Sequence, residues 1–107
     1  MPFFIPEQLS SWSGGKWHDL PKDPVRGFSI DARNLEEGEM FVAIEAERDG
    51  HDYVEQALEN GASSALVNRL QLHIPIPQLL VENTLKAFQE IALTHRNDFQ
   101  GLITGIT

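Results

Sequence analysis

The run MFVAI at residues 40–44 constrains the fold of this chain more than any other stretch. It is rich in strand-forming residues, and it lacks the polar alternation that marks a strand with one face in water. We therefore expect a central strand that is covered on both faces. Such a strand belongs in a sheet with other elements packed on each side.

Strand-like and helix-like segments alternate in the second half of the sequence. Residues 64–67 and 78–81 are short apolar strand candidates. One helix with an apolar stripe is expected to begin near Asp52, and another is expected to begin after a capping Asn83. This order predicts an α/β fold, a small mixed and partly parallel sheet with helices packed on it.

Two details of these helices can be tested. Asp52 with Glu55 has the pattern of a capping box, in which a side chain accepts a hydrogen bond from the first turn. The second helix is expected to bury one stripe of residues: Leu85, Phe88, Ile91, Ala92 and His95.

The segment RGFSIDAR, residues 26–33, alternates apolar and polar residues and predicts a half-buried strand. This strand would place Ser29, Asp31 and Arg33 on one face, toward the carboxyl end of the strand. An acidic residue, a hydroxyl and a guanidinium in that position suit a polar ligand.

A second polar cluster, ERDGHD, follows the central strand. It supplies Glu47, Arg48, Asp49 and His51 in a glycine-containing loop. Ligands of open α/β sheets gather outside the carboxyl ends of strands. Two such ends, side by side, would bring Arg33 and Arg48 to one crevice, where guanidinium and loop N–H groups could hold a diphosphate.

Each cluster also has a plainer interpretation. An Asp-x-Arg at a strand end is more often a surface ion pair, and exposed pairs contribute little. A charged loop is usually a solvated connection. Spacing alone leaves both interpretations open.

Composition narrows the classes of function. The 107 residues suit one domain, and the formal net charge of −8 argues against a broad nucleic-acid or anionic-membrane surface. There are no cysteines, and the four histidines are scattered, so we expect no metal site. The start, MPFFIPEQL, lacks the features of a signal peptide, and no segment is suited to membrane insertion, which favours a cytoplasmic protein.

Three segments, read in order, resemble the Mur ligases, the enzymes that build cell-wall precursors. They are GFSIDARNLEEGEMFVAIEAERDGHDYVEQALENGASSALV, PIPQLLVENTLKAFQEIA and the terminal GLITGIT. Residues 27–107 follow the family pattern nearly throughout, from an acidic-x-Arg strand end to a GeRxDGHdF loop and a PQLvVxdT strand. The resemblance implies the amino-terminal domain of a Mur ligase, and PQLLVENTLKAF points to the branch that adds D-alanyl-D-alanine.

The resemblance implies that this domain holds the UDP part of UDP-N-acetylmuramoyl-tripeptide. Carried over by position, the binding residues are Ser29, Ile30, Asp31, Ala32, Arg33, Glu47, Arg48, Asp49 and His51. No catalytic residue and no metal ligand is implied in this domain. Two residues depart from the family pattern: Ala32 stands where Ser or Thr is usual, and Ala46 replaces a frequent glycine.

In the family, the strand matching GLITGIT runs into the phosphate loop TGxxGKT. We therefore expect residues 1–107 to be a single UDP-substrate-binding domain whose partner is a central ATPase domain beyond Thr107. ATP and Mg²⁺ would belong to the parent enzyme, which forms an amide bond through an acyl phosphate, and this chain alone would be inactive. The alternative is a folded docking module that has lost ligand binding. Ala32 and the negative net charge favour this alternative.

Overall fold

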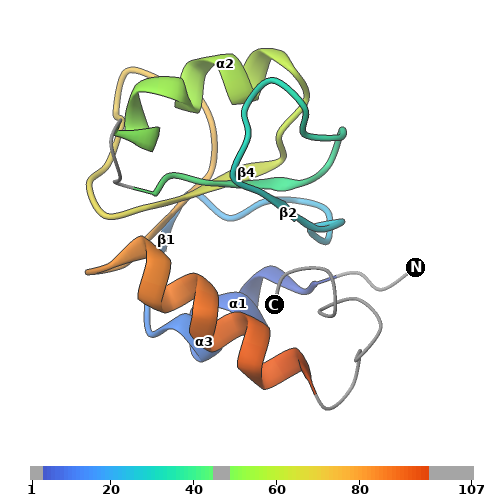
Figure 1. Cartoon of the computed structure of the whole chain (residues 1–107), viewed down its shortest axis with the longest axis vertical. Helices are drawn as coiled ribbons and strands as arrows, with labels where there is room; N and C mark the ends of the chain where they lie inside the picture. Colours follow the sequence, from blue (N-terminus) through green and yellow to red (C-terminus); the bar gives the residue numbers. More distant parts are fainter. Residues whose placement is uncertain (1–3, 45–48, 97–107) are drawn as a thin grey trace.

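The computed structural model describes residues 4–44 and 49–96, which form three layers (Figure 1). A five-stranded sheet lies between one helix on one face and two helices on the other. The elements in chain order are α1 (Pro6–Ser13), β1 (Lys16–His18), β2 (Phe28–Ser29), β3 (Met40–Val42), the 3₁₀ helix η1 (Gly50–Tyr53), α2 (Val54–Glu59), β4 (Ser64–Val67), β5 (Gln78–Leu80) and α3 (Thr84–Arg96).

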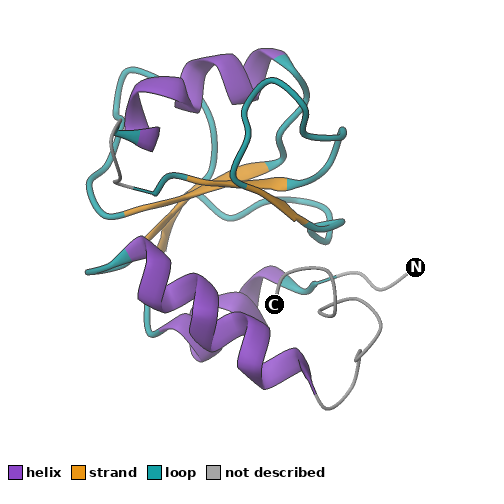
Figure 2. Ribbon diagram, viewed as in Figure 1, coloured by secondary structure: helices purple, strands orange, loops and turns teal. Residues whose placement is uncertain are grey.

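The sheet has the order β1-β5-β4-β3-β2. Its strands, orange in Figure 2, lie between the helices of the two outer layers. Strands β2, β3, β4 and β5 pair in parallel, whereas β1 runs antiparallel to β5. The prediction of a small mixed, partly parallel sheet is confirmed. Because β2 and β3 are parallel neighbours, the segments that leave their carboxyl ends emerge at the same edge of the sheet.

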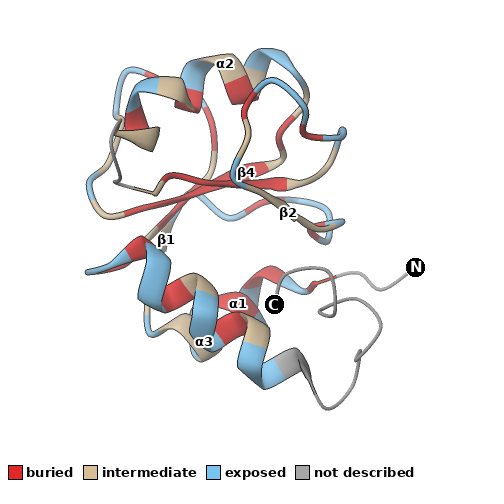
Figure 3. Cartoon of the chain, viewed as in Figure 1, coloured by how far each residue is buried: buried red, intermediate tan, exposed pale blue. Residues whose placement is uncertain are grey.

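Strand β3 is covered on both faces, as the sequence predicts. Met40 and Val42 belong to the apolar cluster on the side of α1 and α3, while Phe41 and Ala43 belong to the cluster beneath α2. All four residues are buried. Figure 3 shows buried residues concentrated in the middle of the sheet. Apolar residues at every position therefore serve both layers of the core at once.

Helix α1 is fixed at both ends. Pro6 occupies its first turn, and Gly14 closes it in the left-handed conformation with φ of 75°. The indole Nε1 of Trp17 in β1 donates to the carbonyl oxygen of Pro6 at 2.7 Å. The helix and the edge strand that follows it are thus tied together directly.

The predicted capping box at Asp52 is wrong. Asp52 lies inside η1, and α2 begins only at Val54. The cap belongs to Asp49, whose carboxylate accepts from the backbone N–H of His51 at 2.9 Å. Because Asp49 captures the first free N–H of the segment, the helical region starts one 3₁₀ turn earlier than the sequence pattern indicates.

Helix α3 begins as predicted, but one residue of its stripe was misplaced. The side chain of Asn83 accepts from the N–H of Lys86 at 3.0 Å. Leu85 is exposed, whereas Ala87 and Ile91 are buried. The buried face starts from Thr84 and follows helical spacing, which turns Leu85 outward.

Some predictions lie outside the described residues, among them the strand GLITGIT and the side chain of His95. Across residues 4–44 and 49–96, no helix is long and apolar enough to cross a membrane. The longest described helix, α3, has 13 residues.

Candidate functional site

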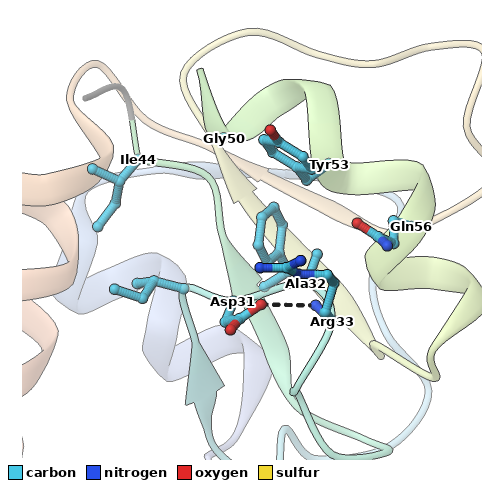
Figure 4. A pocket seen from close by; sticks show the side chains of 9 residues that line it. Asp31, Ala32, Arg33, Ile44, Gly50, Tyr53 and Gln56 are labelled. Carbon is cyan, nitrogen blue, oxygen red and sulfur yellow. Dashed lines mark hydrogen bonds between the residues drawn. The ribbon is translucent and has the colours of Figure 1, made fainter. Parts of the chain in front are cut away.

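A pocket of about 650 Å³ opens where the chain leaves β2 and β3 (Figure 4). One wall is the turn after β2, and its members are Ile30, Asp31, Ala32 and Arg33. These four residues were all predicted from the sequence as binding residues. The structure thus brings one of the two predicted clusters to a hollow at the carboxyl ends of neighbouring strands.

The predicted strand over residues 26–33 is wrong in its second half, because β2 ends at Ser29. The Ser29 hydroxyl accepts from the N–H of Asp31 at 3.1 Å and donates to the Asp31 carbonyl at 3.0 Å. The Asp31 carboxylate accepts from the N–H of Arg33 at 2.9 Å and from the side-chain amide of Asn34 at 2.7 Å. Such bonds from side chains to the local backbone replace the strand ladder with a turn.

This turn divides the predicted residues by role. The polar groups of Ser29 and Asp31 hold the turn itself. Ala32 is buried, and its carbonyl accepts from the side-chain amide of Asn60 at 2.8 Å. Ile30 is 64% exposed at the pocket, and the exposed Arg33 side chain also lines it. Ile30 and Arg33 are therefore the members of this turn best placed to meet a ligand.

The pKa of Asp31 is lowered from its ordinary value of 3.8, chiefly by the backbone N–H of Arg33 and next by the Asn34 side chain. The depressed folded-state pKa makes the carboxylate stabilise the fold above the unfolded-state pKa. That contribution is lost as the pH falls through the folded value. We expect a carbon-detected NMR titration to give Asp31 a midpoint below 3.8, and Asn34→Ala to raise that midpoint. A wild-type midpoint at or above 3.8 would contradict the bonding described here.

The opposite wall comes from η1 and α2, and sequence reasoning missed it. Its members are Gly50, Tyr53 and Gln56, which face the turn after β2 (Figure 4). Phe41 and Ile44 complete the lining from β3 and the segment after it. The spacing of three between Tyr53 and Gln56 places them on one helical face, but the sequence does not show that this face meets the turn after β2.

Gly50 makes a close backbone approach to the segment after β3. Its N–H donates to the carbonyl of Ile44 at 2.9 Å. A Cβ atom at this position would lie 2.7 Å from the backbone nitrogen of Ile44. Only glycine fits this approach without displacement of the backbone that lines the pocket.

Asp49 and His51, both predicted to bind the ligand, do not line the pocket. The Nδ1 atom of His51 lies 2.7 Å from Oδ1 of Asp49, and its Nε2 accepts from the N–H of Asn68 at 3.0 Å. His51 is buried, and Asp49 also forms an ion pair with Arg69. The ring of His51 therefore lies in the interior, and the Asp49 carboxylate is engaged by His51 and Arg69.

Glu47 and Arg48 lie outside the described residues, so the convergence of Arg48 with Arg33 stays a prediction. Among the described lining residues, Arg33 is the one cation. In the same part of the chain, no group of three or more His, Cys, Asp or Glu residues could hold a metal ion. An apolar floor, one guanidinium and an amide suit the binding of a small polar or anionic molecule.

Curated relatives of this chain are ligases. No family model matches it. It is 41% identical over 90 residues to the UDP-N-acetylmuramoyl-tripeptide–D-alanyl-D-alanine ligase of Escherichia coli. The aligned region covers 83% of this chain and 19% of that protein. The Bacillus subtilis ligase of the same name is 34% identical over 89 residues, which are 78% of this chain and 19% of that protein. A UDP-N-acetylmuramoyl-L-alanyl-D-glutamate–2,6-diaminopimelate ligase of Halalkalibacterium halodurans is 33% identical over 85 residues, with 78% and 17% covered.

Solved structures agree with these relatives. MurF from Acinetobacter baumannii superposes with a TM-score of 0.85 at 29% identity, covering 92% of this chain and 22% of that one. The MurF ligase from Thermotoga maritima, solved in complex with ADP, has a TM-score of 0.62 at 29% identity, with 70% and 18% covered. This chain thus spans 17% to 22% of the length of these proteins. Over the region that they share, it belongs to the Mur ligase family, and its fold is that of the amino-terminal domain of MurF.

Proposed function

We propose that this chain binds the UDP part of UDP-N-acetylmuramoyl-tripeptide in the pocket between the turn after β2 and helix α2. The observation that carries the proposal is the position of the pocket. It opens at the carboxyl ends of two parallel strands, in a domain whose relatives are named as ligases of UDP-N-acetylmuramoyl substrates.

The lining suits the two chemical parts of a nucleoside diphosphate. A volume of about 650 Å³ lies within the range of small-molecule sites. Ile30 and Ile44 offer apolar surface for a base or ribose, and Arg33 offers a guanidinium for phosphate oxygens. Because the net charge of −8 repels a diphosphate, binding would depend strongly on that guanidinium.

The chemistry of the parent enzyme is part of the same proposal. We infer that ATP and Mg²⁺ are bound by a central ATPase domain, and that D-alanyl-D-alanine is added there rather than in this domain. The described pocket lining contains no Ser, Cys, Lys or His that could form a nucleophile–base pair. Its role would be to hold the cytoplasmic UDP-linked substrate for the remaining domains.

Titration of the chain with UDP to millimolar concentration, followed by amide NMR, tests the proposal. We expect the largest shifts at residues 30–33 and 50–56. Arg33→Ala should weaken binding by about tenfold, the loss expected for one charge-assisted hydrogen bond. Arg26→Ala removes the same charge from an exposed position outside the pocket lining, and it should leave the affinity within about twofold.

Two results would count against the proposal. The absence of shifts at millimolar UDP would leave the docking module as the better interpretation. Equal weakening by Arg33→Ala and Arg26→Ala would show that net charge, rather than the pocket, governs binding.

A further inference from the structure

His51 connects two segments of the chain. It is 3% exposed, and it directly follows Gly50, which lines the pocket. Its Nδ1 faces the carboxylate of Asp49, two residues earlier. Its Nε2 accepts from the N–H of Asn68, the residue after β4. The ring therefore joins the start of η1 to the end of a neighbouring strand.

The two contacts define which ring nitrogen carries the proton. The backbone N–H of Asn68 can only donate, so Nε2 must be the acceptor. The proton of the neutral ring then lies on Nδ1 and is donated to Asp49 at 2.7 Å. Asp49 is held in turn by the ion pair with Arg69, the neighbour of Asn68.

Gly50 has little room to adapt if this connection is lost. Its own N–H donates to the carbonyl of Ile44, and a Cβ atom added to it would meet the backbone of residues 43 and 44. We propose that His51 is a positioning residue, which fixes the Gly50 edge of the pocket through its bond to Asn68. Its effect on ligand affinity rests on the proposed function, but its effect on Gly50 does not.

Two substitutions of similar shape distinguish the bond that His51 makes to Asn68 from the bond that it makes to Asp49. Glutamine can place an amide oxygen near the position of Nε2 and keep the bond to Asn68. Asparagine reaches only the position of Nδ1, so His51→Asn removes the bond between the side chain at position 51 and the Asn68 N–H. His73→Asn, at an exposed residue of the loop before β5, is the matched control.

Hydrogen exchange and UDP titration then give two independent readouts. In His51→Asn we expect the amides of Gly50 and Asn68 to exchange at least about tenfold faster. The amide of Leu79 in β5, which pairs with Leu66, should keep its wild-type rate. In His51→Gln and His73→Asn all of these rates should stay within about twofold of wild type.

Affinity should follow the same order. We expect His51→Asn to raise the UDP dissociation constant about tenfold and His51→Gln to leave it near the wild-type value. Equal Gly50 exchange in His51→Asn and His51→Gln would overturn the positioning role. If wild-type chain fails to bind UDP, the proposed function falls, while the exchange rates still decide the role of His51.

Discussion

Replacing Phe41 with alanine is expected to lower the free energy of unfolding by about 3–5 kcal/mol. Phe41 is 1% exposed and lies in β3 beneath α2. Its cluster is rich in small side chains, among them Ala32, Ala57 and Ala65. These alanines cannot extend into the vacated space, so most of the cavity would persist. Urea unfolding monitored by circular dichroism would measure the loss.

The control for this change is Leu93→Ala on α3. Leu93 is 61% exposed, and its truncation should change stability by no more than about 0.5 kcal/mol. Phe41→Leu should fall between the two, because it keeps most of the apolar volume. A loss below about 1.5 kcal/mol for Phe41→Ala would mean that the layer beneath α2 collapses around the cavity.

Replacing Gly50 with alanine is expected to cost about 1–3 kcal/mol and to disturb the pocket at the same time. The added Cβ would meet the backbone nitrogen of Ile44 at 2.7 Å and its carbonyl oxygen at 2.9 Å. Both are main-chain atoms directly after β3, so no side-chain rotation relieves the clash. Thermal unfolding would report the destabilisation, and amide shifts at Ile44 and Tyr53 would report the disturbance.

Gly14→Ala provides the matched comparison. Gly14 has a positive φ of 75°, but a Cβ there would meet nothing within 4 Å. This substitution therefore costs only the left-handed strain of about 1 kcal/mol. A greater loss at Gly14 than at Gly50 would contradict the close approach of Gly50 to the segment after β3.

The sequence predicted those features of the fold that depend on local apolar pattern. Residues 40–44 were uniformly apolar, which sufficed to predict a strand with two covered faces. Residues 26–33 also alternated, yet that strand stops at Ser29. The competing bonds from Ser29 and Asp31 to their own backbone leave no trace in apolar periodicity.

The candidate site was predictable on one wall only. The turn after β2 carries its polar residues in one contiguous stretch, which pointed to Arg33, whereas Ile30 was named only through the family resemblance. Tyr53 and Gln56 were missed because their relevance depends on where α2 crosses the sheet. His51 was predicted as a contact residue from its motif, and only the backbone of the distant Asn68 reveals that its ring faces the interior.

The turn after β2 is complete without any bound molecule, since its serine and carboxylate are already satisfied within the chain. A ligand that binds against this wall of the pocket would meet a turn that is already ordered. That segment already loses its conformational entropy on folding. The entropic cost of ordering the protein on binding is therefore smaller, and more of the favourable contact energy appears as affinity.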